Sequence, residues 1–396
     1  MTYYLLPYSD LQLYEFLEYK STNQPNEPPP LYISESLAHY LYEMKVKIED
    51  KDKKWDIYKK YTNPYEYIHT NVPFKNKCIA KHKPLSRSYF KMVEMCNIFS
   101  ILEKYHTISS IQTFHLAEGP GGFIEAVARY RNNPEDKYYG MTLQDKNPNV
   151  PAWKKTGEFL HHFPNVHIEN GSDNTGNILS LENFDHVVNK YKNIDVITAD
   201  GGFDFSMDFN KQETFIAKLL YAQTAFAISI QKRDGTFILK IFDVFMRHTV
   251  DILNLLSSFY KHVYIMKPHT SRYANSEKYV ICMGFLYEHS ESYKYVYYLR
   301  NALKDMLSNE ESIPLSFLKI PPCSMFLQKI EEYNAIFGQK QMQNIQYTMT
   351  LIENKNKFEK IDTLVKTNMK KCIEWCTRHN ISRHYLPDHS NIFIPY

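Results

Sequence analysis

Residues 114–123 read FHLAEGPGGF, and this stretch decides the fold. An apolar run is followed by three glycines around Pro120 and then by the start of a helical pattern. A glycine turn between a strand and a helix is the place where open α/β sheets bind nucleotides. The usual dinucleotide-binding pattern is absent, because Pro120 separates the glycines and no acidic residue ends the next apolar run, GMTL. The turn alone is equally compatible with a purely structural role.

Glycine is scarce in the rest of the chain. Only 12 of the 396 residues are glycine, about half of the usual ~7%. Ten of these lie between Gly119 and Gly235, and two groups of adjacent glycines stand at expected strand ends. A chain with so few glycines is expected to use them where the backbone turns sharply or approaches a ligand.

On both sides of this turn, short apolar runs alternate with helical patterns, which is typical of a parallel βαβ sheet. The expected strands are 111–117, 138–143, 166–169, 195–199, 236–240, 263–267 and 279–285. The expected crossover helices are 122–131, 152–162, 178–192, 210–231 and 244–260. No helical pattern separates the last two strands, so the last strand should return antiparallel. We therefore expect an α/β fold with a seven-stranded, mostly parallel sheet and helices on both faces.

Two extensions flank the expected sheet domain, which covers residues 61–288. Residues 1–60 contain a Pro-rich linker and then apolar residues at helical spacing from Leu37 to Ile48. Residues 289–396 are expected to be helical, and their best helical patterns are 325–352 and 361–378.

Composition limits the class of protein. Lys and Arg number 47 against 44 Asp and Glu, so nucleic acid is not bound through bulk charge and any anion site must be local. The six cysteines are sparse, as in reduced core thiols, and Cys372, Cys376 and His379 lack the fourth ligand of a structural zinc site. We expect no metal. With no secretory pattern and no apolar run of ~18 residues, we expect a cytoplasmic protein without a membrane partner.

The residues around the turn resemble a known family. EGPGGF (118–123) resembles motif I of the FtsJ-like (RrmJ-like) family of S-adenosylmethionine-dependent RNA ribose 2′-O-methyltransferases. HLAEGPGGF (115–123) is similar to the form HLCEAPG of eukaryotic and viral mRNA cap methyltransferases. Further resemblances follow in chain order: NPYE (63–66), SRSYFK (86–91), YGMTL (139–143), DNTGNI (173–178), TADGGFD (198–204), FILKIF (237–242) and KPHTSRYANSEKYVIC (267–282). The series spans about residues 61–285 and implies a Rossmann-like methyltransferase fold.

The resemblance implies a catalytic tetrad of Lys91, Asp200, Lys240 and Glu277. Without the family, Lys91 could be a solvated lysine, Asp200 a turn cap and Glu277 a surface charge. Lys240 is harder to explain in that way, because it follows a strand buried on both faces and so lies at the edge where such folds place their chemistry. We expect Lys240 to take the proton of a ribose 2′-hydroxyl or to orient that hydroxyl.

The resemblance also implies contacts with S-adenosyl-L-methionine. The turn should surround its methionine end, and Asp173 and Asn174 should lie near the adenine. Thr142 stands where many members have a carboxylate that holds the ribose, with Asp145 as a substitute. The expected cofactor contacts are Glu118, Gly119, Pro120, Gly121, Gly122, Phe123, Thr142, Asp173, Asn174 and Asp200.

A basic run leads into the expected active-site helix. Residues 75–91 hold six Lys or Arg and no carboxylate, which is typical of a track for RNA phosphates. A solvated basic loop has the same composition. The expected RNA contacts are Lys75, Lys77, Lys81, Lys83 and Arg87.

These features predict an enzyme that methylates the ribose 2′-oxygen of a cap-proximal nucleotide. Its partners would be capped mRNA and other proteins of the capping machinery. Two alternatives stay open: the same chemistry on ribosomal or transfer RNA, and a non-catalytic RNA-binding subunit that has kept the fold. The cap-type motifs favour the first function, and the complete tetrad argues against the last.

Overall fold

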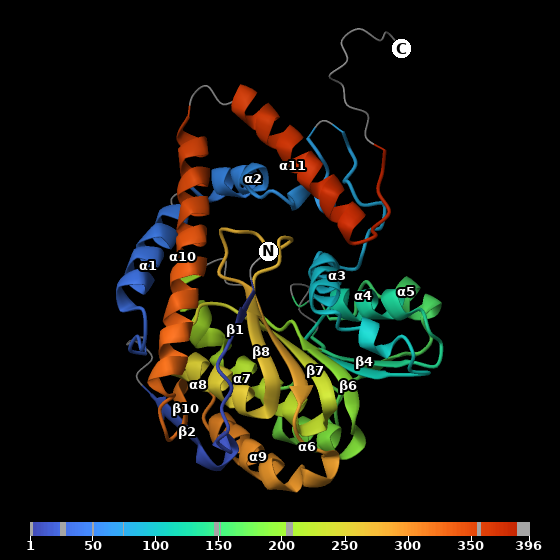
Figure 1. Ribbon diagram of the computed structural model, residues 1–396, viewed down its shortest axis with the longest axis vertical. Coiled ribbons are helices and arrows are strands. Elements are labelled where there is room, and N and C mark those ends of the chain that lie inside the picture. Colours follow the sequence, from blue (N-terminus) through green and yellow to red (C-terminus); the bar gives the residue numbers. More distant parts are fainter. Residues whose placement is uncertain are drawn as a thin grey trace.

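The computed structural model describes residues 3–23, 29–49, 51–73, 75–145, 150, 152–202, 209–354 and 358–385. Its centre is an eight-stranded sheet with the order β1-β8-β9-β7-β6-β3-β4-β5 (Figure 1). The strands are β1 (Tyr3–Leu5), β3 (Gln112–Leu116), β4 (Lys137–Met141), β5 (Val166–Glu169), β6 (Ile194–Ala199), β7 (Gln231–Ile241), β8 (Tyr260–Met266) and β9 (Lys278–Phe285).

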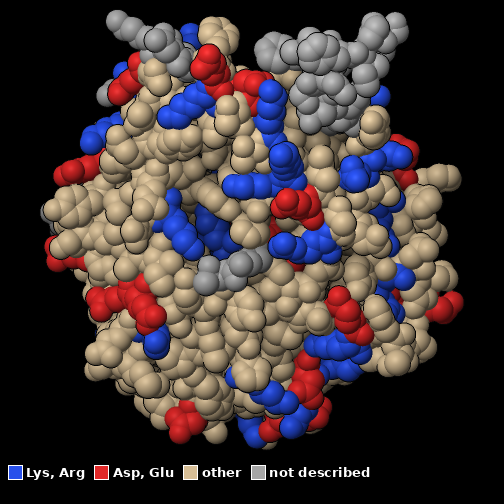
Figure 2. All heavy atoms as spheres, turned by 45° about the horizontal axis from the view of Figure 1, so that its top comes forward, with Lys and Arg blue, Asp and Glu red and all other residues tan. Residues whose placement is uncertain are grey.

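The connections between these strands confirm the predicted α/β fold. Strands β3 to β7 form the parallel part of the sheet. The helices that follow β3 to β7 in turn are α4 (Gly122–Arg131), α5 (Gly157–His162), α6 (Leu181–Lys190), α7 (Gln212–Ile230) and α8 (Arg247–Phe259). Strand β9 lies between β7 and β8 and is antiparallel to both, as expected for the last strand. When the molecule is turned by 45° so that the top of Figure 1 comes forward, it is hollowed at its centre, with Lys and Arg in and around the hollow (Figure 2).

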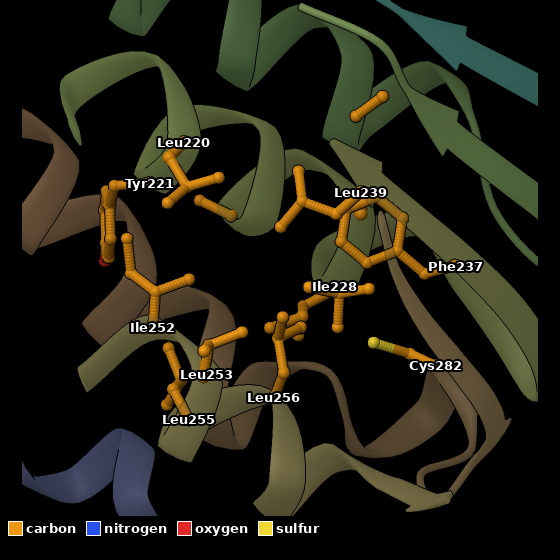
Figure 3. Packing of buried hydrophobic residues seen from close by; sticks show 14 of the residues in the cluster. Leu220, Tyr221, Ile228, Phe237, Leu239, Ile252, Leu253, Leu255, Leu256 and Cys282 are labelled. Carbon is orange, nitrogen blue, oxygen red and sulfur yellow. The ribbon is translucent and has the colours of Figure 1, made fainter. Parts of the chain in front are cut away.

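Apolar cores cover both faces of the sheet. On one face, Ile228 of α7 and Leu256 of α8 pack with Phe237 and Leu239 of β7 (Figure 3). Ile238, between these two strand residues, belongs to the core on the other face. That face is covered by α3 (Ser88–Phe99), α4 and α5. Alternation along each strand therefore places neighbouring residues in different cores.

Sequence analysis misses three short strands. Strand β1 pairs antiparallel with β8 and makes the sheet eight-stranded rather than seven-stranded. Its three residues are too few to show an alternating pattern. Strands β2 (Leu17–Thr22) and β10 (Ile313–Leu318) form a separate antiparallel pair, so the region after residue 288 is not helical throughout. The bulged register of β2 and β10 breaks the periodicity that would have revealed them.

The two ends of the chain pack against each other and against the sheet. The helices concerned are α1 (Glu35–Glu49), α2 (Asp52–Thr62), α10 (Ser324–Glu353) and α11 (Phe358–Arg378). Helices α1 and α2 contact α10, and α11 contacts the short 3-10 helix η2 (Glu66–Ile68) (Figure 1). Asn334 and Gln341 of α10 donate hydrogen bonds to the carbonyls of Val244 and Ala274. None of the helices in the described part of the chain is long and apolar enough to cross a membrane.

Candidate active site

Strand direction brings three of the expected tetrad residues to one edge of the sheet. Asp200 directly follows β6, and Lys240 is the next-to-last residue of β7. Strands β6 and β7 are parallel, with Ala199 opposite Leu239, so the two residues are neighbours. Strand β9 runs the other way and begins just after Glu277. Parallel strands end at the edge where an antiparallel neighbour begins, so Glu277 lies at the same place.

The fourth residue, Lys91, comes from helix α3 above this edge. Its Nζ lies 2.6 Å from Oε1 of Glu277. The Nζ of Lys240 lies 3.3 Å from Oδ1 of Asp200 and donates a 2.7 Å hydrogen bond to the Asp200 carbonyl. The four residues, which are far apart in the chain, therefore form two ion pairs side by side.

Tyr279 joins the two ion pairs. It is the direct partner of Lys240 across β7 and β9, so the two side chains lie on the same face of the sheet. Its hydroxyl donates to Oδ1 of Asp200 at 2.9 Å and lies 3.3 Å from Oε1 of Glu277. Sequence analysis did not select Tyr279. The signal was available, because in an extended strand a residue two positions after Glu277 returns to the same face.

Burial and charge act against each other in this cluster. Burial raises the pKa of Glu277, but the positive charges of Lys91 and Lys240 outweigh it and hold this pKa well below its usual range. Burial lowers the pKa of Lys91, and the carboxylates of Glu277 and Asp200 oppose that shift. The side chains of Lys240 and Asp200 are each 13% exposed, so this pair can be reached from outside. The formal charges cancel, which makes a partly buried cluster of ions tolerable.

The loop that carries Glu277 is held by two buried carboxylates. Glu66 of the NPYE segment accepts hydrogen bonds from Nε and Nη2 of Arg272, at 3.0 and 2.6 Å. Glu94 of α3 accepts hydrogen bonds from the backbone N–H groups of His269 and Thr270, at 2.8 and 3.1 Å. Burial raises the pKa of Glu94 to about 7. These bonds connect the loop to two segments that lie before β3 in the chain.

The glycine turn stands at the switch point of the sheet, beside the carboxyl ends of β3 and β6, and this place is called the crevice below. Strand β3 lies between β4 and β6, so the chain leaves β3 toward one side and later returns to the other. Such a switch point is where open α/β sheets bind their ligands. Gly121 has φ +102°, and a Cβ there would come within 3.0 Å of Trp153. On the other side of the crevice, a Cβ at Gly202 would lie 3.2 Å from Nζ of Lys240.

Two of the expected cofactor contacts support the turn from behind and do not line the crevice. The carboxylate of Glu118 is buried and accepts hydrogen bonds from the Ile124 N–H and the Thr198 hydroxyl, at 2.7 and 3.0 Å. Phe123 is fully buried, and its ring packs 5.8 Å from that of Tyr279. A cofactor contact at these two positions therefore stays a prediction, since both side chains are buried within the fold.

The remaining expected cofactor residues stand around the crevice. Gly119 and Pro120 are partly exposed, whereas Gly122 is buried where α4 approaches α3. The Thr142 hydroxyl accepts a 3.1 Å hydrogen bond from the Gly119 N–H and so braces the turn. Asp173 and Asn174 are exposed, and their loop is joined to the end of β4 by a 2.7 Å bond from the Gln144 N–H to the Thr175 carbonyl.

The expected RNA contacts separate into two groups. Lys77, Lys81 and Lys83 are exposed, and Lys75 is partly exposed. Arg87 instead turns inward and donates a 3.1 Å hydrogen bond to the Thr270 carbonyl. Arg87 is partly exposed, so its contact with RNA stays a prediction.

Residues 84–285 match the model of the family described as FtsJ-like methyltransferase. The cap-specific mRNA (nucleoside-2′-O-)-methyltransferase 2 of Drosophila melanogaster is 28% identical over 52% of this chain and 31% of its own. The cap-specific mRNA (nucleoside-2′-O-)-methyltransferase 1 of Trypanosoma brucei brucei is 30% identical over 55% of this chain and 58% of its own. A Caenorhabditis briggsae relative, named inactive cap-specific mRNA (nucleoside-2′-O-)-methyltransferase 1B, is 26% identical over 75% of this chain and 38% of its own. The chain thus spans less than two thirds of each relative.

Proposed function

Because the chain belongs to the FtsJ-like methyltransferase family, we propose that it methylates the ribose 2′-oxygen of a cap-proximal nucleotide of mRNA. The observation that carries this proposal is the meeting of Lys91, Asp200, Lys240 and Glu277 at the mouth of one crevice. The printed names of the relatives support capped mRNA as the substrate.

The crevice fits S-adenosyl-L-methionine, which supplies an activated sulfonium methyl group when it is bound. Gly119 and Gly121 let the turn pack closely against Ala152 and Trp153, and the partly exposed backbone at Gly119 and Pro120 is left to face the methionine end. The Thr142 hydroxyl oxygen accepts a hydrogen bond from the Gly119 N–H, so its own O–H can donate to a ribose oxygen of the cofactor. The exposed side chains of Asp173 and Asn174 can hold the adenine end. We assign these residues to the cofactor on chemistry and placement.

The protein must place the 2′-oxygen in line with the methyl group, and the ribose 2′-hydroxyl must lose its proton during the transfer. An O–CH₃ bond forms and the S–CH₃ bond breaks. The hydroxyl proton leaves to water, or to the Lys240 amine once this amine has given up its own extra proton. Lys240 orients the hydroxyl, while Asp200 fixes its Nζ at the strand edge. The pair of Lys91 and Glu277 keeps the neighbouring charges in place. Positioning of this kind can contribute up to about 7–11 kcal/mol to catalysis.

The proposal is tested by transfer of a labelled methyl group to two RNAs of the same sequence, one capped and one uncapped. Nuclease mapping then locates the label. We expect label on the ribose of a cap-proximal nucleotide of the capped RNA and background on the uncapped one. Equal labelling of both RNAs would contradict cap specificity and favour a structural RNA as substrate. No labelling of either RNA would favour a non-catalytic subunit. One relative is named as inactive, so loss of activity in similar proteins has a precedent.

A further inference from the structure

The segment after helix α11 lies along the predicted basic run. The Lys81 N–H donates to the Ser382 carbonyl at 2.9 Å, and the His384 N–H donates to the Ile79 carbonyl at 2.8 Å. A bridge also pairs Ala80 with Arg383 in antiparallel orientation. The C-terminal part of the described chain is thus bonded along its backbone to the segment that holds Lys77, Lys81 and Lys83.

Helix α11 packs with one face buried against the protein and leaves its cations exposed on the other side. The ring of Trp375 packs edge-on to Phe90, with centroids 5.9 Å apart, and Phe90 is the neighbour of Lys91 in α3. On the same buried face, Asn368 donates a 2.8 Å hydrogen bond to the Tyr61 carbonyl. Lys371 and Arg378 are exposed, and they lie seven residues apart on one side of the helix.

Helix α11 contacts the segment before α3, because the Cys372 thiol donates to the Pro64 carbonyl at 3.5 Å. The ring of Tyr65, the residue after Pro64, lies 4.8 Å from the ring of His269, which belongs to the loop that carries Glu277. Figure 2 shows Lys and Arg in and around the hollow of this face.

The charge of this surface has one dominant sign. Residues 367–385 hold four Lys or Arg and one carboxylate, Glu374. Residues 75–91 hold no carboxylate. The exposed cations that the two segments bring together are Lys77, Lys81, Lys83, Lys370, Lys371, Arg378 and Arg383. A band of this kind matches a polyanion whose charges repeat along a chain.

We propose that the last part of α11, from Lys370 to Arg378, forms one continuous track with residues 381–384 and the basic run, and that this track binds the phosphates of the RNA chain beyond the methylated nucleotide. This inference rests on the proposed function and adds the C-terminal helix to its substrate site. The track raises the affinity for a long RNA and takes no part in methyl transfer at the tetrad. A substrate too short to reach α11 should therefore not sense the track.

The test compares three proteins. One carries both Lys371→Glu and Arg378→Glu, the second carries the milder changes Lys371→Gln and Arg378→Gln, and the third is the wild type. The matched control reverses Lys304 and Lys319 to Glu, which changes the net charge equally. Lys304 lies on α9 (Tyr293–Leu307), at the opposite end of the molecule in Figure 1. The probes are a capped RNA of about 20 nucleotides and a capped dinucleotide, and each variant's thermal midpoint reports its folding.

For the long RNA we expect KM to rise about tenfold or more in the Glu variant, less in the Gln variant and not in the control. The slope of log binding constant against log salt should fall by about 1.4, at ~0.7 for each lost phosphate contact. Transfer to the dinucleotide should stay at the wild-type rate. An unchanged KM and salt slope, or an equal loss with the dinucleotide, would overturn the track. If the wild type methylates neither probe, the proposed function fails, whereas RNA binding and its salt slope still decide on the track.

Discussion

At the scale of single residues, the site depends on a group that is not one of the four charged residues. The Tyr279 hydroxyl donates to Asp200 and lies within reach of Glu277, so it is placed between the two ion pairs. Burial and these carboxylates raise the pKa of Tyr279 well above its ordinary value. The hydroxyl therefore stays protonated and remains a donor to Asp200.

Tyr279→Phe should lower turnover at least about tenfold and leave KM for RNA nearly unchanged. A hydrogen bond to a charged group contributes about 1.5–3 kcal/mol, and its loss lets Asp200 move relative to Lys240. Steady-state methyl transfer measures both constants. Tyr264→Phe on the neighbouring strand β8 is the matched control. Wild-type turnover in Tyr279→Phe would show that the bridge has no part in positioning.

At the scale of elements, the loop between β8 and β9 is the part most dependent on the rest of the chain. Glu66 and Glu94, which lie before β3 in the chain, accept hydrogen bonds from this loop. Gln341 of α10, in the C-terminal region, donates a hydrogen bond to it. Since Glu277 ends this loop, the position of one tetrad residue is set by bonds from both ends of the chain.

Glu94 should make the stability of the protein fall as pH rises toward neutrality. Its pKa is about 7 in the fold against an ordinary 4.5, so the fold favours the protonated carboxyl. The resulting stabilisation is complete below pH 4.5 and is lost as pH rises through about 7, by about 3 kcal/mol in total. The difference in unfolding free energy between wild type and Glu94→Gln should fall by that amount over this range.

Urea unfolding at several pH values measures this difference, with the exposed Glu158→Gln as the matched control. Parallel curves for wild type and Glu94→Gln across pH 4.5 to 7.5 would contradict the assignment.

Most of the sheet follows from local sequence, whereas the packing around the site does not. The runs that precede Asp200 and Lys240 are apolar and end in polar residues, so the edge where chemistry occurs could be predicted. The hydrogen bonds of Glu118 and Arg87 could not be predicted, because their partners Thr198 and Thr270 are distant in sequence. Strand β1 escaped prediction because it has only three residues and pairs with β8, which is distant in sequence.

At the scale of the whole molecule, the terminal helices and the sheet domain form one structure around the crevice. Helix α10 bonds to the loop of the tetrad, and α11 packs on the helix that carries Lys91. The N-terminal helices α1 and α2 pack on α10. The extensions therefore shape the approach to the site as well as covering the sheet.

The account depends most on Lys240, at the strand edge between Asp200 and the crevice. The deciding measurement is the single-turnover rate of methyl transfer to capped RNA by Lys240→Ala, together with calorimetric binding of S-adenosyl-L-methionine. The rate should fall at least about 100-fold, within the range lost with a proton-transfer group, while the affinity for the cofactor stays close to that of the wild type. A variant that keeps more than a few per cent of the wild-type rate would contradict the proposed role of Lys240 and of the charged cluster around it.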